Sequence, residues 1–388
     1  MSNGNIPPKR KYDIVLYGAT GYTGKYAATY LAKRVNDSAL NIGIAGRNET
    51  KLNALKKTLY KGGNIDVIKA DSKNEDELRD MIKDTIVLVS CVGPFRLYGE
   101  LIVKLCAELG THYTDICGEP DFIERMAFKY YDMAKNSGAI IVSACGFDSI
   151  PADMGHMYLS QYYKNIGAEC AEMNAYHTGK FPKGYSINVG TLFSLVNSMS
   201  NIGELKKLRK QAESVTWKTS KKLLNRIGNK LRVNFKPMFY SKESKRYSFV
   251  FQGADSAVVT NSQGINNALL DSQGIKTVYQ PYFACYLSFN AKYQIQKILL
   301  VGSIFITLLK YNFGKTLIQT FPSIFTLGAF SYNGPSDAQK KAASFKTQFF
   351  SKGYSKKILN KYVNNKEDIK NNEKMDMNIR LTIGGNDP

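Results

Sequence analysis

The stretch YDIVLYGATGYTG, from Tyr12 to Gly24, decides the fold of the N-terminal half. It begins with an apolar run typical of a buried strand and ends in three glycines at three-residue spacing, Gly18, Gly21 and Gly24. The residues that follow predict a helix, and a dinucleotide-binding fold requires this order of strand, glycine turn and helix. We therefore expect a doubly wound parallel α/β sheet, a Rossmann fold, with a dinucleotide at the loop.

Each glycine of the loop has its own physical role in this interpretation. Gly18 permits a tight turn, Gly21 lets the backbone approach a pyrophosphate, and Gly24 lets the helix pack closely on the strand. The helix N-terminus adds N–H groups and the positive end of its dipole. An ordinary glycine turn in a sheet protein is the alternative. We assign the whole loop to the cofactor: Gly18, Ala19, Thr20, Gly21, Tyr22, Thr23 and Gly24.

The ends of the next two expected strands indicate which cofactor binds. Arg47 ends the expected strand over 41–47, where NAD-binding proteins usually place an acid for the ribose 2′-hydroxyl. A guanidinium suits a 2′-phosphate, so we predict NADP(H); a surface arginine at a helix start is the alternative. Asp71 ends the third strand and, with Ser72, is a candidate for the adenine edge. Ser72 or Asn74 could equally cap the next helix.

The fourth expected strand ends on Val92, Gly93 and Pro94, after a continuous apolar run typical of a central parallel strand. Carboxyl ends of parallel strands meet at one edge of a sheet, where the nicotinamide half of the cofactor would pass. We therefore place these three residues in the cofactor site. Tyr98 follows closely and is our candidate proton donor, because a phenol can donate to a developing anion.

Two later strand ends bring acids toward the same edge. Asp115 lies in the segment 113–120, which we interpret as a short strand and an exposed turn, and the strand over 139–145 runs into Asp148 and Ser149. We predict that these side chains face the substrate, with Asp148 and Ser149 as catalytic candidates; helix capping by either is the alternative. The sequence shows no catalytic triad and no pair of general acids, so the mechanism stays open at this point.

The length of 388 residues favours two domains, which we expect at 1–155 and 156–388. The net charge of +21 is concentrated in the second, because residues 1–150 carry 20 Lys and Arg against 18 Asp and Glu, whereas residues 151–388 carry 33 against 14. Such an excess indicates an acidic membrane surface or nucleic acid as partner, with a solvated surface as the alternative. No helix-turn-helix or aromatic-basic RNA pattern accompanies it, so we expect no nucleic acid.

Beyond residue 155 the alternation of strands and helices stops, and the pattern predicts a smaller α+β domain. We expect strands or mixed segments over 168–178 and 186–196, partly helical structure over 204–236, and antiparallel strands over 247–261. Residues 377–383 predict a last strand.

The six cysteines form no CxxC pair and the three histidines are scattered, so we expect no metal site. Reduced thiols in an intracellular compartment fit this usage best. The N-terminus MSNGNIPPKRKYD contains no apolar signal region, which agrees with that expectation.

One long apolar block, residues 298–330, stands in the second half. As a helix, its first run, ILLVGSIFITLL, would be about 18 Å long, short of a hydrocarbon core of about 30 Å. Lys297 and Lys310 bracket this run, and Pro322 interrupts the next one. We predict a re-entrant hairpin or interfacial helices that associate with a membrane; a buried core helix is the alternative.

Together these stretches resemble the saccharopine dehydrogenase-like oxidoreductase family, in the branch related to bacterial trans-acting enoyl reductases. The resemblance implies an N-terminal Rossmann domain with a dinucleotide, and an α+β domain inserted before C-terminal elements that return to the first. Vertebrate-type members are associated with lipid droplets and membranes. Family members continue past a terminal turn, so the chain is expected to be truncated at GGNDP. The similar stretches are GATGYTG (18–24), AGR (45–47), CVGPF (91–95), YTDICGEP (113–120), GFDSIPADMG (146–155), GADSAVV (253–259) and segments within 321–355.

The resulting hypothesis is an NADP(H)-dependent oxidoreductase of lipid-like substrates at a lipid droplet or the cytosolic face of a membrane. Saccharopine is not the expected substrate, because no arginine cluster for a multi-carboxylate ligand stands near the sheet edge. The competing hypothesis is a non-catalytic nucleotide-binding protein of the same surface, since no catalytic signature is visible. The sequence leaves the substrate, the reaction direction and the oligomeric state open, and a homo-oligomer is compatible with it.

Overall fold

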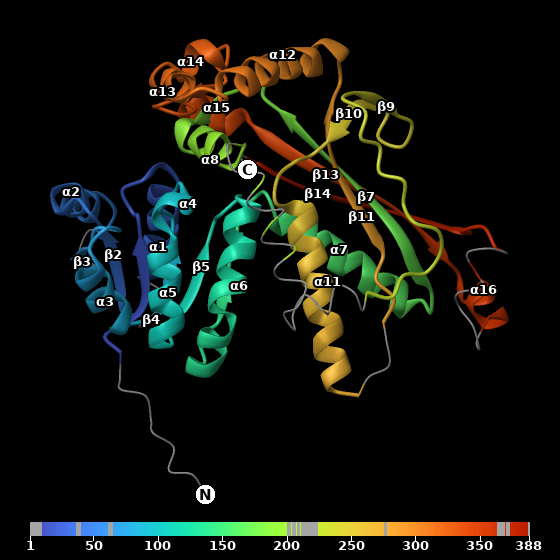
Figure 1. Cartoon of the computed structure of the whole chain (residues 1–388), viewed down its shortest axis with the longest axis horizontal. Coiled ribbons are helices and arrows are strands. Elements are labelled where there is room, and N and C mark those ends of the chain that lie inside the picture. The colour runs from blue at the N-terminus through green and yellow to red at the C-terminus, as the bar shows by residue number, and fades with distance from the viewer. Residues whose placement is uncertain are drawn as a thin grey trace, which may run out of the picture. The chain divides into compact units, whose positions relative to one another are not determined.

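The computed structural model describes residues 10–35, 40–60, 65–199, 224–274, 278–362 and 373–386, and the single residues 203, 207, 210 and 369 (Figure 1). These residues form two compact units. The first comprises residues 1–146 with 193–198, and the second comprises 147–192 with 199–388. The first unit thus ends before the boundary expected at residue 155 and includes a short later segment.

The first unit contains a six-stranded parallel sheet in the order β3-β2-β1-β4-β5-β6. In this order β1 and β4 are neighbours, and successive strands are added outward from this pair, first on the β1 side and then on the β4 side. This topology confirms the doubly wound fold expected from the sequence. The strands are β1 (Tyr12–Tyr17), β2 (Ile42–Gly46), β3 (Ile65–Lys69), β4 (Thr85–Ser90), β5 (His112–Asp115) and β6 (Ile141–Val142). The helices are α1 (Tyr22–Val35), α2 (Glu49–Leu59), α3 (Glu75–Lys83), α4 (Phe95–Tyr98), α5 (Glu100–Leu109) and α6 (Pro120–Ser137).

The core of the first unit lies on both faces of this sheet. On one face Leu16 packs with residues of α1 and α2, such as Leu52. On the other, Val15 packs with residues of α3, α5 and α6, such as Leu78 and Ile102. Both Val15 and Leu16 are fully buried, because a central parallel strand is covered on both faces.

Asparagines begin two of these helices. The Asn48 side chain accepts a hydrogen bond from the Lys51 N–H at the start of α2. Asn74 accepts from the Asp76 and Glu77 N–H groups at the start of α3. Of the two capping candidates in this turn, Asn74 is therefore the one that caps the helix.

The second unit is built on a mixed six-stranded sheet in the order β14-β13-β7-β11-β10-β9. Neighbours are antiparallel except for β7 and β11, which are parallel. Two short strands, β8 (Ile187–Asn188) and β12 (Phe330–Ser331), pair separately. The six strands are β7 (Glu169–Lys180), β9 (Phe239–Ser241), β10 (Arg246–Val250), β11 (Tyr282–Phe289), β13 (Ser344–Tyr354) and β14 (Met377–Asn386).

Helices α7 (Ile150–Asn165) and α11 (Asp255–Ser272) contact each other and strands of this sheet, α7 on β7 and α11 on β11. Leu159 and Tyr163 of α7 are buried there with Phe349 of β13. A second cluster joins Tyr176 and Tyr286, whose rings stack. The other helices are α8 (Val189–Met199), α12 (Lys292–Leu308), α13 (Asn312–Thr320), α14 (Pro322–Phe325), α15 (Asp337–Ala342) and α16 (Lys356–Lys361).

The structure corrects one sequence prediction in this unit and refines another. The strand prediction over 247–261 is wrong beyond Val250, because α11 begins at Asp255. The β-branched residues there favour a strand locally, but Asp255, Val259 and Gln263 recur every fourth residue and are all buried, which is a helical spacing. Within 186–196 the strand ends at Asn188 and α8 follows.

The remaining predictions for the second unit concern two strands, the basic segment and the apolar block. The strands over 168–178 and 377–383 are confirmed as β7 and β14. The part of 204–236 that the structure describes continuously, 224–236, contains no helix, and most of the rest lies outside the described residues. The apolar block becomes α12, α13 and α14, and none of the helices described is long and apolar enough to cross a membrane.

Candidate functional site

The glycine loop joins β1 to α1 at the carboxyl edge of the first sheet. Gly18 has a φ of +83°, and a Cβ atom there would lie 2.7 Å from Val92 Cγ2. A Cβ on Gly24 would lie 2.1 Å from the Gly18 carbonyl oxygen, so helix and loop touch at this point. At Gly21 that same oxygen, at 3.2 Å, is the one described atom that a Cβ would meet. The fold therefore requires the first and third glycines, whereas the second leaves space beside the backbone.

The rest of the loop is held to the neighbouring strand. The Gly18 and Ala19 N–H groups donate to the Ala45 carbonyl of β2 at 2.9 and 3.3 Å. The Ala19 side chain is buried among residues of α1 and α2, so it supports the loop from beneath. Gly21 and Thr23 are exposed at the start of the helix. The first N–H groups of a helix have no acceptor within the helix, and helix N-termini of this kind bind anions in other proteins.

Arg47 and Asp71 converge at the ends of adjacent strands. Arg47 directly follows β2 and is exposed. Burial raises the pKa of the Tyr17 phenol and the Asp71 charge adds to this shift, while Ser72 and Arg47 act in the opposite sense. The Asp71 carboxylate also accepts a hydrogen bond from the Lys73 N–H. The assignment of Arg47 to the ribose phosphate and of Asp71 to the adenine stays a prediction.

The loop after β4 carries Val92, Gly93 and Pro94, and the Gly93–Pro94 peptide bond is cis. Val92 lies against Gly18, which brings the β4 loop next to the glycine loop. Pro94 precedes the short helix α4, and Tyr98 is the last residue of that helix, half-buried. The structure thus brings these candidates to the same edge as the glycine loop.

A buried glutamate fixes the start of α4. Glu119 accepts hydrogen bonds from the Phe95 and Arg96 N–H groups at 3.0 and 3.1 Å and from the Ser194 hydroxyl at 2.7 Å. Burial raises the pKa of this carboxyl, although the three donors oppose the shift. Sequence reasoning did not single out this role, because Ser194 comes from a distant segment.

Asp115 does not face a substrate. Its side chain is 1% exposed and accepts from the Tyr113 hydroxyl at 2.9 Å and from the Cys117 and Ala144 N–H groups at 2.9 and 2.8 Å. The prediction of a substrate-facing acid is therefore wrong here. The carboxylate instead ties β5 to the turn after β6, and burial raises its pKa.

Asp148 and Ser149 belong to the second unit, at the start of α7, whereas Tyr98 belongs to the first. Ser149 occupies the N-cap position, but its side chain makes no capping hydrogen bond, and its buried hydroxyl has no partner within the described part of the chain. Asp148 is half-buried. Burial and the nearby Asp255 charge raise the pKa of Asp148 to about 6.

Four buried polar side chains meet in the second unit. His177 Nε2 lies 2.9 Å from Asp255 Oδ2, and His177 Nδ1 lies 2.7 Å from Thr347 Oγ1. Cys285 Sγ lies 3.7 Å from the same carboxylate oxygen. These residues come from β7, α11, β13 and β11, which are far apart in the sequence, so no short sequence pattern predicts the cluster. Its single trace in the sequence is Asp255 within GADSAVV.

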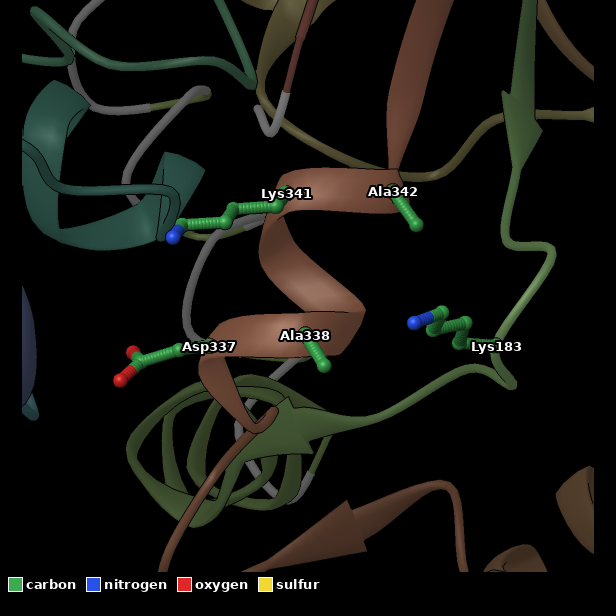
Figure 2. A pocket seen from close by; sticks show the side chains of 5 residues that line it. All are labelled: Lys183, Asp337, Ala338, Lys341 and Ala342. Carbon is green, nitrogen blue, oxygen red and sulfur yellow. The ribbon is translucent and has the colours of Figure 1, made fainter.

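A surface pocket of the second unit lies between α15 and Lys183 (Figure 2). Lys183 points toward the side of α15 that carries Ala338 and Ala342, while Asp337 and Lys341 project from other sides of the helix. Asp337 forms an ion pair with Lys340. The small side chains and exposed charges of this pocket supply no set of converging polar groups, so we assign it no function.

The first unit therefore defines a class of protein. A parallel sheet in this order, with a GxxGxxG loop where the strand order reverses, is a nucleotide-binding Rossmann domain. Residues 14–142 match the family model described as the saccharopine dehydrogenase NADP binding domain. The chain belongs to the saccharopine dehydrogenase-like oxidoreductase family, and its cofactor is NADP(H).

Relatives along most of the chain support this assignment. A saccharopine dehydrogenase-like oxidoreductase of Rattus norvegicus is 32% identical over 358 residues, 89% of this chain and 80% of the relative. A lipid droplet localized protein of Caenorhabditis elegans is 33% identical over 359 residues, 90% and 80% of the two chains. A putative trans-acting enoyl reductase of Mycobacterium tuberculosis is 36% identical over 204 residues, 52% and 48%. The resemblance noted in the sequence is thereby confirmed.

A solved structure shares the fold. The saccharopine dehydrogenase (L-Glu forming) of Saccharomyces cerevisiae has a TM-score of 0.52 at 11% identity, over 97% of this chain and 86% of that one. Likeness at this identity speaks for the architecture alone. The protein is thus an NADP(H)-dependent oxidoreductase by family.

Proposed function

We propose that this oxidoreductase acts on a lipid-like substrate while attached to a lipid droplet or the cytosolic face of a membrane. The observation that carries the proposal is an apolar surface on α12, α13 and α14, here called the lipid-facing surface. The three helices follow one another in contact (Figure 1). Its members are large apolar side chains with at least 40% of their area exposed: Ile298, Leu299, Leu300, Ile304, Ile306, Phe313, Phe321, Ile324 and Leu327.

The same helices have a buried side that holds them to the protein. Ile295, Phe305 and Ile318 are almost completely buried. The block is therefore not simply a core helix, which was the alternative in the sequence. Exposed apolar patches of this kind mark interaction surfaces in proteins, and two short helices in succession suit an interface better than a span.

Charge favours a phospholipid surface over a neutral one. Lys292, Lys297, Lys310 and Lys315 lie in or between these helices, and the sequence has no Asp or Glu from residue 292 to residue 336. Lysines beside an inserted apolar face attract anionic headgroups, each by about 1 kcal/mol when close to the surface. The name of the nematode relative agrees with this location.

The substrate class rests on the same reasoning and on the mycobacterial relative, whose name describes an enoyl reductase. NADPH supplies a hydride when it is bound, and reduction of a C=C or C=O bond also needs one proton. We assign that proton to the Tyr98 hydroxyl at the end of α4, and assign Asp148 and Ser149 to the substrate. The cofactor would be held by the loop Gly18–Gly24, by Arg47 and Asp71, and by Val92, Gly93 and Pro94.

A flotation assay tests the attachment. The variant Leu300→Ser/Ile306→Ser/Ile324→Ser/Leu327→Ser removes four exposed side chains, each worth about 1.5 kcal/mol when buried in lipid. We expect the parent to float with vesicles containing phosphatidylserine and the variant to stay in the dense fraction. The control Ile265→Ser/Leu269→Ser removes two exposed side chains of α11 and should float like the parent. Equal flotation of parent and quadruple variant would contradict the proposal.

A non-catalytic NADP(H)-binding protein is the second candidate. It is favoured by Asp115, which is engaged in structural hydrogen bonds, and by the absence of a triad in the sequence. NADPH consumption with a trans-2-enoyl thioester, measured on vesicle-bound parent and on Tyr98→Phe, separates the two. Tight NADPH binding without turnover on this and on carbonyl lipids would support the second candidate.

A further inference from the structure

We propose that the second unit contains a zinc site formed by His177, Asp255 and Cys285. The proposal is independent of the lipid substrate and of the cofactor. The side chains offer one nitrogen, one oxygen and one sulfur ligand, and these atoms all lie within 4.8 Å of one another. All three residues are buried, with exposed fractions of 4%, 0% and 1%.

The distances are close to those of tetrahedral zinc. With Zn–S near 2.3 Å and Zn–O and Zn–N near 2.1 Å, sulfur and oxygen ligands stand about 3.6 Å apart and nitrogen and oxygen about 3.4 Å apart. Cys285 Sγ and Asp255 Oδ2 are already 3.7 Å apart. His177 Nε2 and Asp255 Oδ2 are hydrogen-bonded at 2.9 Å and need to separate by only a few tenths of an ångström.

A second observation points to a ligand at this place. Asp255 Oδ1 is buried and has no hydrogen-bond partner among the described residues. A carboxylate oxygen in that position is costly unless a cation or donor meets it. A cation bound to Oδ2 would lower this cost through its charge on the same carboxylate.

The surroundings of His177 also suit a metal ligand. Thr347 Oγ1 lies 2.7 Å from His177 Nδ1 and can accept a hydrogen bond from the Nδ1–H group. This tautomer leaves Nε2 as the coordinating atom. Metal-binding histidines are commonly oriented by such a hydrogen bond on the other ring nitrogen. The Phe147 and Phe251 rings lie 6.0 and 5.6 Å from the imidazole and enclose it in apolar surface.

Charge and donor type select the ion. One carboxyl and one thiol lie beside a single imidazole in this cluster. A divalent cation would balance these groups in their ionised forms. Thiolate and imidazole ligands favour Zn²⁺ over Mg²⁺ or Ca²⁺, which prefer oxygen. Three protein ligands leave a fourth position for water or another small ligand.

The test uses the untagged full chain, stripped with a chelator and then dialysed against Zn²⁺. We expect one equivalent of bound zinc by elemental analysis, and a thiolate-to-metal absorption band when Co²⁺ replaces it. Cys285→Ser and His177→Gln should bind less than a tenth of an equivalent. Cys170→Ser is the matched control, because Cys170 is equally buried in the same apolar cluster but lies outside the ligand set. Thr347→Val should weaken binding by about 10–100-fold.

Two results of the binding experiment would overturn the proposal: a parent chain that binds no zinc, or a Cys285→Ser variant that binds as much as the parent. Thermal unfolding guards against a variant that simply fails to fold. Added Zn²⁺ should raise the unfolding midpoint of the parent and of Cys170→Ser. An unchanged midpoint in the parent contradicts the site, whatever the variants do.

Discussion

The glycine loop of the first unit and the His177–Asp255–Cys285 cluster of the second differ in how far apart in the sequence their parts lie. The loop consists of backbone from one continuous stretch, so its need for close approach and unusual backbone angles appears in the sequence as glycines at fixed spacing. The cluster is made of side chains from four elements that the sheet topology brings together. The comparison shows that a site formed by local backbone can be read in a sequence, whereas one formed by long-range pairing needs the fold.

The same contrast holds for close packing. Gly24 and Gly353 are equally constrained, since a Cβ would lie 2.1 Å from the Gly18 oxygen at one and 2.2 Å from the Glu169 oxygen at the other. The first glycine belongs to a recognisable pattern. The second shows no pattern, because its neighbour comes from β7, far away in the sequence.

The largest expected effect tests this equivalence. Gly24→Val and Gly353→Val should each lower the free energy of unfolding by about 3–5 kcal/mol, because backbone atoms would have to move. Urea unfolding followed by circular dichroism measures both. Gly302→Ala is the control, since nothing lies within 4 Å of its Cβ position in α12, and it should be neutral or stabilising by up to about 1 kcal/mol. If Gly353→Val left the free energy of unfolding unchanged, Gly353 would not be as constrained as Gly24.

Gly21→Val separates binding from folding within the loop. Its side chain would meet one carbonyl oxygen at 3.2 Å but would occupy the space where we place the pyrophosphate. We expect loss of NADPH binding by at least about 100-fold in a fluorescence titration, with a circular dichroism spectrum like that of the parent. Retained binding would reduce Gly21 to a structural turn.

Arg47→Ala sharpens the assignment of the cofactor corner. An exposed guanidinium that binds a 2′-phosphate contributes about 1–3 kcal/mol, so NADPH affinity should fall by about 5–150-fold. NADH lacks this phosphate, and its affinity should stay nearly unchanged. Isothermal titration with both cofactors measures the difference, and equal losses for both would contradict the role of Arg47.

The smallest effect concerns pH and Glu119. Because burial raises its pKa in the folded state, the native protein binds more protons than the unfolded chain between the ordinary value, about 4.3, and the raised one. Stability should therefore fall as the pH rises through this window, and Glu119→Gln should lack this contribution. Urea midpoints of both proteins at several pH values report it. Parallel curves would show that the carboxyl titrates normally.

Much of the first unit follows from local rules. Strand β4 is a mostly apolar run followed by a loop with Gly93 and Pro94, and Asn74 caps α3 by ordinary side-chain chemistry. The fold class and the cofactor could therefore be predicted. The prediction for Asp115 failed because its position at a strand end is compatible with both a substrate contact and a structural bond, and only its three donors decide.

The second unit was less predictable because tertiary contacts override local preference. Residues 255–261 have strand-forming side chains but form a helix, since Asp255 and Val259 are buried at helical spacing. The expectation of no metal site used spacing along the chain, which gives no information about side chains as far apart in sequence as His177 and Cys285; the zinc site that we propose there would contradict it. The family resemblance, in contrast, spanned both units and was confirmed by relatives along most of the chain.

The position of β7 in its sheet has a consequence for synthesis on the ribosome. Its two neighbours are β11 (Tyr282–Phe289) and β13 (Ser344–Tyr354), both of which emerge long after Lys180. Until then a twelve-residue strand, most of it buried in the finished protein, has both edges open. Open strand edges pair readily with other chains, and such pairing between distant segments is slow. The nascent chain should therefore depend on chaperones until Tyr354 has left the exit tunnel, and chains released before residue 344 should aggregate.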